Sequence, residues 1–122
     1  MNATPPTISR FFTAMQAGAA ARTDMMNLFA DHAVYVEPFS GKALTHDGKQ
    51  AILSVMEAGW AHPMPDMRIT VDRVDVDGDR VIADWTCHSP ALPGGKGRGQ
   101  NRFTLKGGLI VRLETTLVPD AT

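Results

Sequence analysis

The spacing of apolar residues changes once along the chain, and this change limits the folds that the chain can adopt. Before Pro63 and Pro65, apolar side chains recur at intervals of three and four residues, as in amphipathic helices. After the two prolines they alternate with polar residues, which is typical of half-buried strands. Helices that precede a run of strands predict an α+β domain and exclude a succession of βαβ units.

Three helices are predicted in the first half of the chain. The first spans about residues 8–20 and follows two prolines, with Thr7 as the capping hydroxyl. A Thr-Asp pair at 23–24 caps a short second helix, and Asp47 caps a third that continues to about residue 62. The apolar stripes of the first and third helices consist of Ile8, Phe11, Phe12 and Met15, and of Ile52, Val55, Met56 and Trp60.

Five strands are predicted, one before the third helix and four after it. A short strand over 33–37 ends at Pro38, because proline lacks the N–H that a sheet needs, and a loop over 39–46 follows. The remaining four form an antiparallel meander over residues 67–76, 79–88, 99–105 and 109–116, joined by a turn at 77–78, a loop over 89–99 and a turn over 106–108. The apolar residues change parity near Asp72, which predicts a bulge there.

Charge and residue usage limit the possible partners. The 122 residues contain 12 Lys and Arg against 13 Asp and Glu, a net charge of −1. The overall charge of the chain therefore does not indicate binding to nucleic acid or to an anionic membrane. The single cysteine, Cys87, excludes an intramolecular disulfide and a cysteine-based zinc site. The four histidines, His32, His46, His62 and His88, show no metal-binding spacing, so no metal is expected.

The first apolar stretch has two interpretations. Residues 11–21 follow Arg10 and end in small residues, which resembles a signal peptide. The stretch lacks Leu, Ile and Val and is interrupted by Gln16, and its apolar residues fall on a helical stripe. An amphipathic first helix of a cytoplasmic protein is therefore the expectation, and no apolar run is long enough to span a membrane.

Four stretches of the chain carry a resemblance to a known superfamily. They are residues 28–38 (LFADHAVYVEP), 47–52 (DGKQAI), 81–86 (VIADWT) and 101–110 (NRFTLKGGLI). The chain resembles the nuclear transport factor two-like superfamily, and within it the SnoaL-like polyketide cyclases and the relatives of ketosteroid isomerase. The resemblance covers about residues 7–116 and implies a single domain, 1–122, with a cone-shaped curved antiparallel sheet wrapped on three helices, a cystatin-like fold. It also implies a deep apolar pocket and, in many members, a homodimer formed through the outer sheet face.

Glu37 is the first candidate for chemistry. The resemblance places a proton-accepting carboxylate immediately before a proline at the end of the first strand, where this chain has Glu37. Glu37 also shares strand parity with Tyr35, so an apolar wall would desolvate the carboxylate and favour its use as a base. A solvated carboxylate, or one paired with an arginine, is the alternative.

Asn101 and Tyr35 are the candidate hydrogen-bond donors. Asn101 lies two residues before Phe103, where the resemblance implies a carboxylic acid, and its amide is able to donate to a developing oxyanion. A buried amide satisfied by backbone is the alternative. The tyrosine that steroid isomerases carry on the first helix is replaced here by Phe11 or Phe12, which puts steroid isomerisation in doubt. Tyr35 would supply a phenolic donor instead, or only part of the wall.

Further residues are predicted to bind an apolar molecule in the pocket. They are Phe11, Met15, Phe39, Met56, Trp60, Trp85, His88 and Phe103. Trp85 and His88 have opposite parity on the strand over 79–88, and the pattern leaves open which of the two faces the pocket. The seven methionines suit either a core or an adaptable pocket. Lys96, Arg98, Arg102 and Lys106 form either a solvated surface or a cationic rim that attracts a carboxylate or phosphate.

Three functions remain open at this stage. The first is a small cofactor-independent enzyme of the isomerase, cyclase or dehydratase type, in which Glu37 moves a proton next to a carbonyl and Asn101, with Tyr35, holds the enolate oxygen. The second is a small-molecule-binding module with the same pocket and no turnover. The third is a dimeric interaction protein whose pocket is filled by side chains.

Overall fold

The computed structural model describes residues 4–118, which form one curved sheet and a set of helices. The predicted domain limits at 1–3 and 119–122 lie outside the described residues. The elements are α1 (Pro6–Ala17), the 3₁₀ turn η1 (Gly18–Ala21), α2 (Arg22–Met26), β1 (Phe29–Glu37), β2 (Leu44–Asp47), α3 (Lys49–Trp60), β3 (Arg68–Asp77), β4 (Arg80–His88), the 3₁₀ turn η2 (Pro93–Gly95), β5 (Lys96–Lys106) and β6 (Leu109–Val118).

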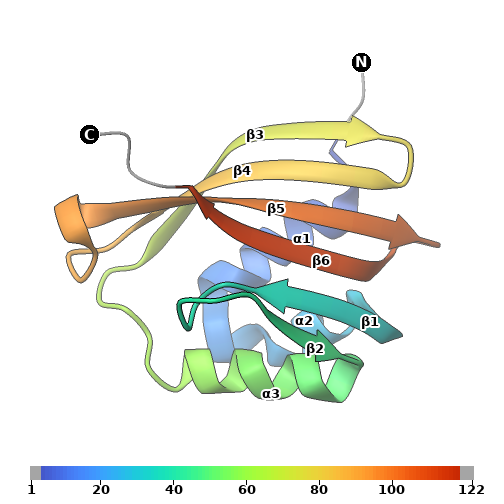
Figure 1. Cartoon of the computed structure of the whole chain (residues 1–122), viewed down its shortest axis with the longest axis horizontal. Coiled ribbons are helices and arrows are strands. Elements are labelled where there is room, and N and C mark those ends of the chain that lie inside the picture. Colours follow the sequence, from blue (N-terminus) through green and yellow to red (C-terminus); the bar gives the residue numbers. More distant parts are fainter. Residues whose placement is uncertain (1–3, 119–122) are drawn as a thin grey trace.

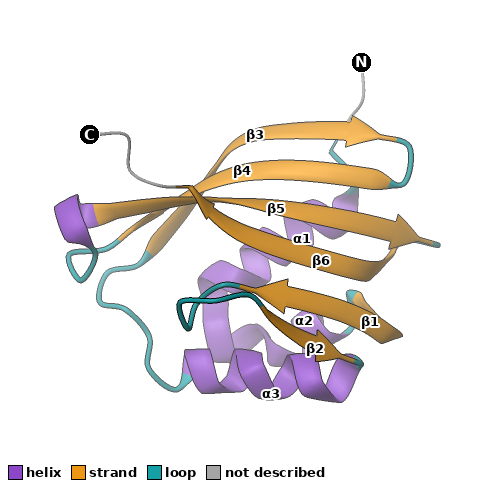
Figure 2. Cartoon of the chain, in the orientation of Figure 1, coloured by secondary structure: helices purple, strands orange, loops and turns teal. Residues whose placement is uncertain are grey.

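The sheet has the strand order β2-β1-β6-β5-β4-β3. All neighbouring strands are antiparallel except β1 and β6, which run parallel. The three helices gather on one side of the sheet, and the strands of the meander extend beyond them (Figures 1 and 2). The predicted α+β architecture, with a curved and mainly antiparallel sheet over three helices, is therefore confirmed, and the parallel pairing of β1 with β6 is the exception to the antiparallel order. No helix within residues 4–118 has the length and apolar character of a membrane span.

The core forms where α1 packs under the sheet. Ile8, Phe11 and Ala14 of α1 are buried, with Phe12 and Met15 half-buried beside them, so the predicted stripe of the first helix is confirmed. The Phe11 ring meets the ring of Phe103 on β5 edge-to-face, with centroids 5.1 Å apart. Such aromatic pairs are favourable beyond their apolar area, and they hold α1 against the middle of the sheet.

The predicted caps at the starts of the helices are wrong in three places. Thr7 lies inside α1, where its hydroxyl donates to the Gly108 carbonyl oxygen at 2.6 Å and joins the helix to the β5–β6 turn. The pair at 23–24 lies inside α2, because the η1 turn leads directly from α1 into α2 and no separate start is needed. Asp47 belongs to β2, and the N-cap of α3 is Gly48, whose φ of 95° suits glycine.

The loop predicted over 39–46 contains a strand. β2 pairs with the end of β1, with Tyr35 opposite His46 and Glu37 opposite Leu44. The sequence of β2, Leu-Thr-His-Asp, is short and mainly polar, so it lacks the apolar alternation from which strands are predicted. This strand brings His46 onto the same face as the candidate residues Tyr35 and Glu37.

The bulge predicted near Asp72 is confirmed. The register of β3 against β4 shifts between Val71 and Arg73, and Asp72 accepts a hydrogen bond from the Thr86 hydroxyl at 2.6 Å. The loop predicted over 89–99 is shorter than expected, since β5 begins at Lys96. Its first residue, Ser89, is fixed by donating to the Pro65 carbonyl oxygen at 2.7 Å, which ties this loop to the connection between α3 and β3.

Candidate functional site

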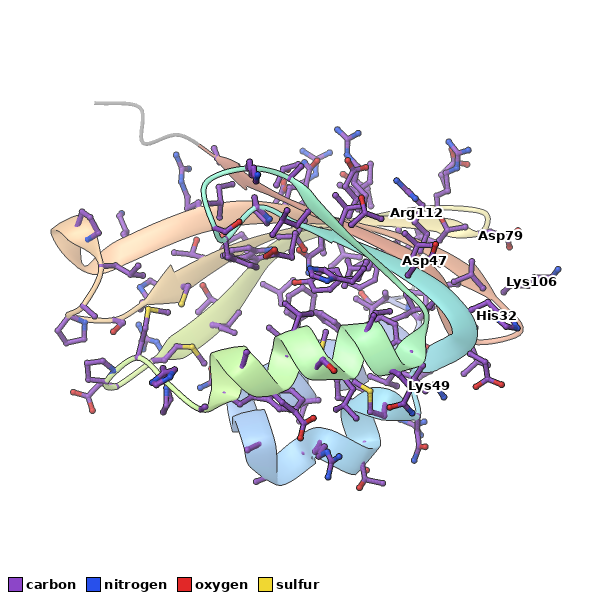
Figure 3. The ribbon with its side chains drawn as sticks, turned by 60° about the horizontal axis from the view of Figure 1, so that its bottom comes forward. His32, Asp47, Lys49, Asp79, Lys106 and Arg112 are labelled. Atoms are coloured by element: carbon purple, nitrogen blue, oxygen red, sulfur yellow. The ribbon has the colours of Figure 1, made fainter. Side chains whose placement is uncertain are left out.

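A cavity of about 420 Å³ opens at one end of the sheet. Its walls come from α1, the β1–β2 loop, the α3–β3 connection, the β4–β5 loop and the ends of β5 and β6. In Figure 1 the loops of this group lie at the left end of the molecule. The side chains labelled in Figure 3, among them Lys49 and Arg112, lie at the opposite end, and none of them lines the cavity. The cavity is therefore remote from that charged end, and most of the residues that line it are apolar.

Six of the predicted site residues line this cavity. They are Phe11, Met15, Tyr35, Phe39, Trp85 and Asn101. The lining also includes Met64, Met67 and Arg98, for which the sequence left a pocket role open. The lining residues that the sequence analysis did not assign to a pocket are Phe12, Ile69, Cys87, Leu92, Gly97, Thr115, Leu117 and Val118. Trp85 and Cys87 share one parity of β4, so this is the face of β4 that borders the cavity.

Five predicted site residues do not line the cavity. Phe103 and Met56 are buried in the core, and Trp60 packs against it from the end of α3. His88 lies on the other face of β4, with Nε2 3.3 Å from the Thr70 hydroxyl. Glu37 is buried beside the β1–β2 loop and is described below.

Asn101 presents a free amide donor to the cavity. Its Oδ1 accepts hydrogen bonds from Trp85 Nε1 at 3.0 Å and from the Thr115 hydroxyl at 2.8 Å. Because an indole N–H can only donate, the atom that faces it must be the amide oxygen, and this fixes the orientation of the amide. Within residues 4–118, Nδ2 has no hydrogen-bond partner. The arrangement therefore leaves an N–H₂ group ready to bind an oxygen of a ligand.

Gly99 determines where the Trp85 indole lies. Gly99 pairs with Trp85 across β4 and β5, and a Cβ atom at Gly99 would overlap the indole ring. The ring therefore lies flat over the glycine, which directs Nε1 to the oxygen of Asn101.

Substitution of Gly99 by Ala should push the indole off the strand. We expect a loss of about 1–3 kcal/mol in unfolding free energy from the overpacking, and a changed tryptophan emission spectrum because the indole loses its place over β5. Chemical denaturation followed by fluorescence measures both effects. Gly97→Ala is the control, since its Cβ would only touch Leu92 at an ordinary 3.8 Å. Equal effects of the two substitutions would contradict this role of Gly99.

Tyr35 is a buried phenol that remains protonated. Burial raises the pKa of Tyr35 well above its ordinary value of 10.0, the negative charge of Glu37 raises it further, and the side chain of Thr115 partly opposes the shift. The phenol therefore keeps its proton across the physiological range, and it lines the cavity as a hydrogen-bond donor.

The pKa of Tyr35 can be followed directly, because it is the only tyrosine in the chain. The folded protein should show no phenolate absorbance at the pH where a free tyrosine ionises, and the signal should appear only as the protein unfolds. The raised pKa means that the folded state holds this proton more tightly than the unfolded chain, so unfolding free energy should fall as the pH rises above about 10. Tyr35→Phe should weaken that fall. Ordinary titration in the folded protein would contradict the assignment.

Glu37 is a buried carboxylate with two neighbours. Only 4% of the residue is exposed, and Oε2 accepts a hydrogen bond from the Phe39 N–H at 3.2 Å. His46 Nε2 lies 3.5 Å from Oε1, an ion-pair contact when the imidazole is protonated. At this distance the contact is not a hydrogen bond, and Nε2 has no hydrogen-bond partner among residues 4–118. The carboxylate thus lies beside the cavity lining formed by Tyr35 and Phe39.

The family model described as a SnoaL-like domain matches residues 8–113, from the first turn of α1 to the middle of β6. The match includes the cavity lining except Thr115, Leu117 and Val118. This chain belongs to the SnoaL-like domain family. The resemblance drawn from the sequence is therefore confirmed. No curated protein matches this SnoaL-like chain.

Solved structures agree with the family assignment. A protein from Sinorhizobium meliloti assigned as a polyketide cyclase is 25% identical, with a TM-score of 0.76 over 93% of this chain and 95% of its own. A SnoaL-like polyketide cyclase from Jannaschia is 15% identical, with a TM-score of 0.77 over 96% of this chain and 90% of its own. A protein from Kribbella flavida assigned as a ketosteroid isomerase is 18% identical, with a TM-score of 0.73 over 97% of this chain and 78% of its own. Other matches are described as nuclear transport factor 2-like and cystatin-like, which confirms the predicted fold.

Thr115 is the most informative of the residues that sequence reasoning missed. It pairs with Asn101 across β5 and β6 and fixes the amide together with Trp85. A regular hairpin around the turn at 107–108 would place Glu114 opposite Asn101, and only the register shift between Thr104 and Leu105 brings Thr115 there, so the sequence carried no signal for this pair. The lining residues Met64, Met67 and Leu92 lie in connections between elements, where no parity signal exists.

Proposed function

We propose that this SnoaL-like protein is a small enzyme that binds an apolar molecule with a carbonyl group and moves a proton next to that carbonyl. The observation that carries the proposal is the free amide nitrogen of Asn101, held in the wall of an apolar cavity by Trp85 and Thr115. A fixed donor in an apolar site favours charge that develops on a carbonyl oxygen.

Two donors and one base would share the reaction. Asn101 Nδ2–H and the Tyr35 phenol would donate to the carbonyl oxygen, and Glu37 would remove a proton from the adjacent carbon. The electron pair of that C–H bond then forms the enolate, whose oxygen the two donors stabilise. Where a C=C bond of the substrate is conjugated with the enolate, Glu37 returns the proton to the far carbon of that system and completes an isomerisation. Where the enolate carbon attacks a second carbonyl of the same molecule, the resulting alkoxide takes the proton from Glu37 and completes a cyclisation. Neither outcome needs a cofactor.

The names of the structural relatives support this class of substrate. Polyketides and ketosteroids both carry ketone groups, and the relatives assigned to them share the fold of this chain. The family position of Glu37 before Pro38 supports its assignment as the base. The carboxylate lies beside the lining rather than in it, so a small movement of the β1–β2 loop would bring it to a bound substrate, as in many unliganded enzymes.

Binding without turnover is the second candidate function. The observation that favours it is that Glu37 does not line the cavity. Its carboxylate already accepts a hydrogen bond from Phe39 N–H and lies 3.5 Å from His46 Nε2, so it is not free to act on a bound molecule. In that case the cavity would hold the same class of molecule, and Asn101 would serve recognition only.

Deuterium exchange separates the two candidates. The protein is mixed in D₂O with a panel of apolar cyclic ketones, binding is followed by thermal shift, and exchange at the carbon next to the carbonyl is followed by NMR. A raised unfolding midpoint with accelerated exchange supports the enzyme. A raised midpoint without acceleration supports the binding module, and neither effect with any ketone contradicts both.

A further inference from the structure

The indole of Trp85 has one covered face and one that borders the cavity. A Cβ atom at Gly99 would lie closest to Cζ2 of the indole and almost as close to the two ring atoms bonded to it, Cη2 at 2.5 Å and Cε2 at 2.7 Å. Such similar distances arise above the plane of a ring and not at its edge, so β5 covers one face of the indole at Gly99. Trp85 is half-buried, lines the cavity and does not pack against the apolar core. No aromatic ring contact within residues 4–118 involves it, so the opposite face is left for a ligand.

The polar edge of the same indole determines where a carbonyl oxygen would lie. Asn101 follows Gly99 by two positions on β5 and therefore shares its face of the sheet. The indole N–H lies in the plane of the ring, and it donates to Asn101 Oδ1 at 3.0 Å. The amide is thus at the edge of the ring rather than over its face, with the free Nδ2 beside it. A flat molecule that lies on the indole can therefore direct an oxygen to Nδ2 without leaving the ring.

We propose that the cavity takes a planar conjugated ketone, whose ring stacks on the Trp85 indole and whose carbonyl oxygen accepts a hydrogen bond from Asn101 Nδ2. This inference rests on the proposed function, because it uses the same cavity and the same donor. It goes further by naming Trp85 as the residue that selects flat molecules and Gly99 as the residue that permits its position. Offset stacking of aromatic rings is favourable beyond the burial of apolar area. An enolate conjugated with the ring is also planar, so the molecule remains stacked when its proton is removed.

Two pairs of ketones test the stacking. Acetophenone is compared with cyclohexyl methyl ketone, and 2-acetylnaphthalene with the corresponding decalin ketone. The members of each pair have the same carbonyl group and nearly the same size, and they differ in whether the ring is flat. Isothermal titration should show the aromatic member of each pair binding about three- to tenfold more tightly. Equal affinities within both pairs would overturn this inference and leave the proposed function standing, whereas no binding by any of the four ketones would overturn both.

Substitutions of the two tryptophans identify the ring responsible. Trp85→Leu should remove the preference for the aromatic ketone, whereas Trp85→Phe should retain part of it, because an aromatic face remains. Both variants lose the N–H that holds Asn101, so the comparison between them isolates the stacking. Trp60→Leu is the control, since Trp60 packs against the core from α3 and does not line the cavity.

Gly99→Ala provides a second test that leaves the indole in the chain. The added Cβ displaces the ring from β5, so the preference should fall although Trp85 is still present. A preference that survives in Trp85→Leu, or in Gly99→Ala where Trp85→Leu does not fold, would overturn the inference.

Discussion

Replacement of Glu37 by Gln is expected to slow deuterium exchange at the carbon next to a bound carbonyl by about 10²–10⁴-fold, the usual contribution of a general base. The amide is nearly the same size as the carboxylate, and its oxygen can still accept the hydrogen bond from Phe39 N–H. The dissociation constant of the ketone should therefore change little. Comparison of NMR exchange rates with titration data on the same ligand separates the loss of chemistry from any loss of binding.

Glu57→Gln provides the matched control for this variant. Glu57 lies on α3, is exposed, and pairs with Arg22 at the surface at 3.3 Å. Its replacement removes one negative charge from the chain without touching the cavity, and exchange should continue at the wild-type rate. If Glu37→Gln and wild type accelerate exchange equally, the protein does not use Glu37 as its base. Binding of the ketone with exchange at the uncatalysed rate in both proteins would support binding without turnover.

Asn101→Leu should have the second large effect. Loss of the amide removes a donor to the developing oxyanion, which typically lowers the rate by about 10²–10³-fold. It also leaves the Trp85 N–H and the Thr115 hydroxyl without their acceptor, and each buried group left unpaired costs about 1–3 kcal/mol. Exchange measurements and chemical denaturation should therefore both show a loss.

Asn101→Asp separates the two consequences. At mildly alkaline pH an ionised carboxylate still accepts hydrogen bonds from Trp85 and Thr115, so most of the stability should return. It has no N–H₂ group, so ketone binding and exchange should stay low. Wild-type exchange in Asn101→Asp under these conditions would contradict the assignment of Asn101 as the donor.

The parts of the fold that the sequence predicted well are those with a long periodic signal. The stripe of α1 and the bulge at Asp72 both follow from the spacing of apolar residues, which burial enforces. β2 was missed because it is short and mainly polar and is held by pairing with β1 rather than by apolar burial. The predicted helix caps were wrong for a similar reason, since turns and glycines outside the periodic segments start the helices instead.

The residues of the candidate site were likewise predictable where they lie on periodic strands and not where they lie in connections. Tyr35 and Asn101 lie on strands, and their parity together with the family resemblance indicated the cavity face. The parity of β4 left open whether Trp85 or His88 borders the cavity. Residues from the connections, such as Leu92, come to the cavity only through the path of the folded chain. The environment of Glu37 could not be predicted either, because it depends on His46, which the missed strand β2 supplies.

The parallel pairing of β1 with β6 also affects how the protein is made. β1 leaves the ribosome early, but its partner β6 is synthesised only after every other strand of the sheet. Until then the edge of β1 that faces away from β2 is unpaired, and the cavity lacks the wall that contains Thr115 and Leu117. Contacts between such distant segments slow folding, and the unpaired edge is prone to join other chains. A nascent chain of this protein is thus expected to need protection from aggregation until its last strand has emerged.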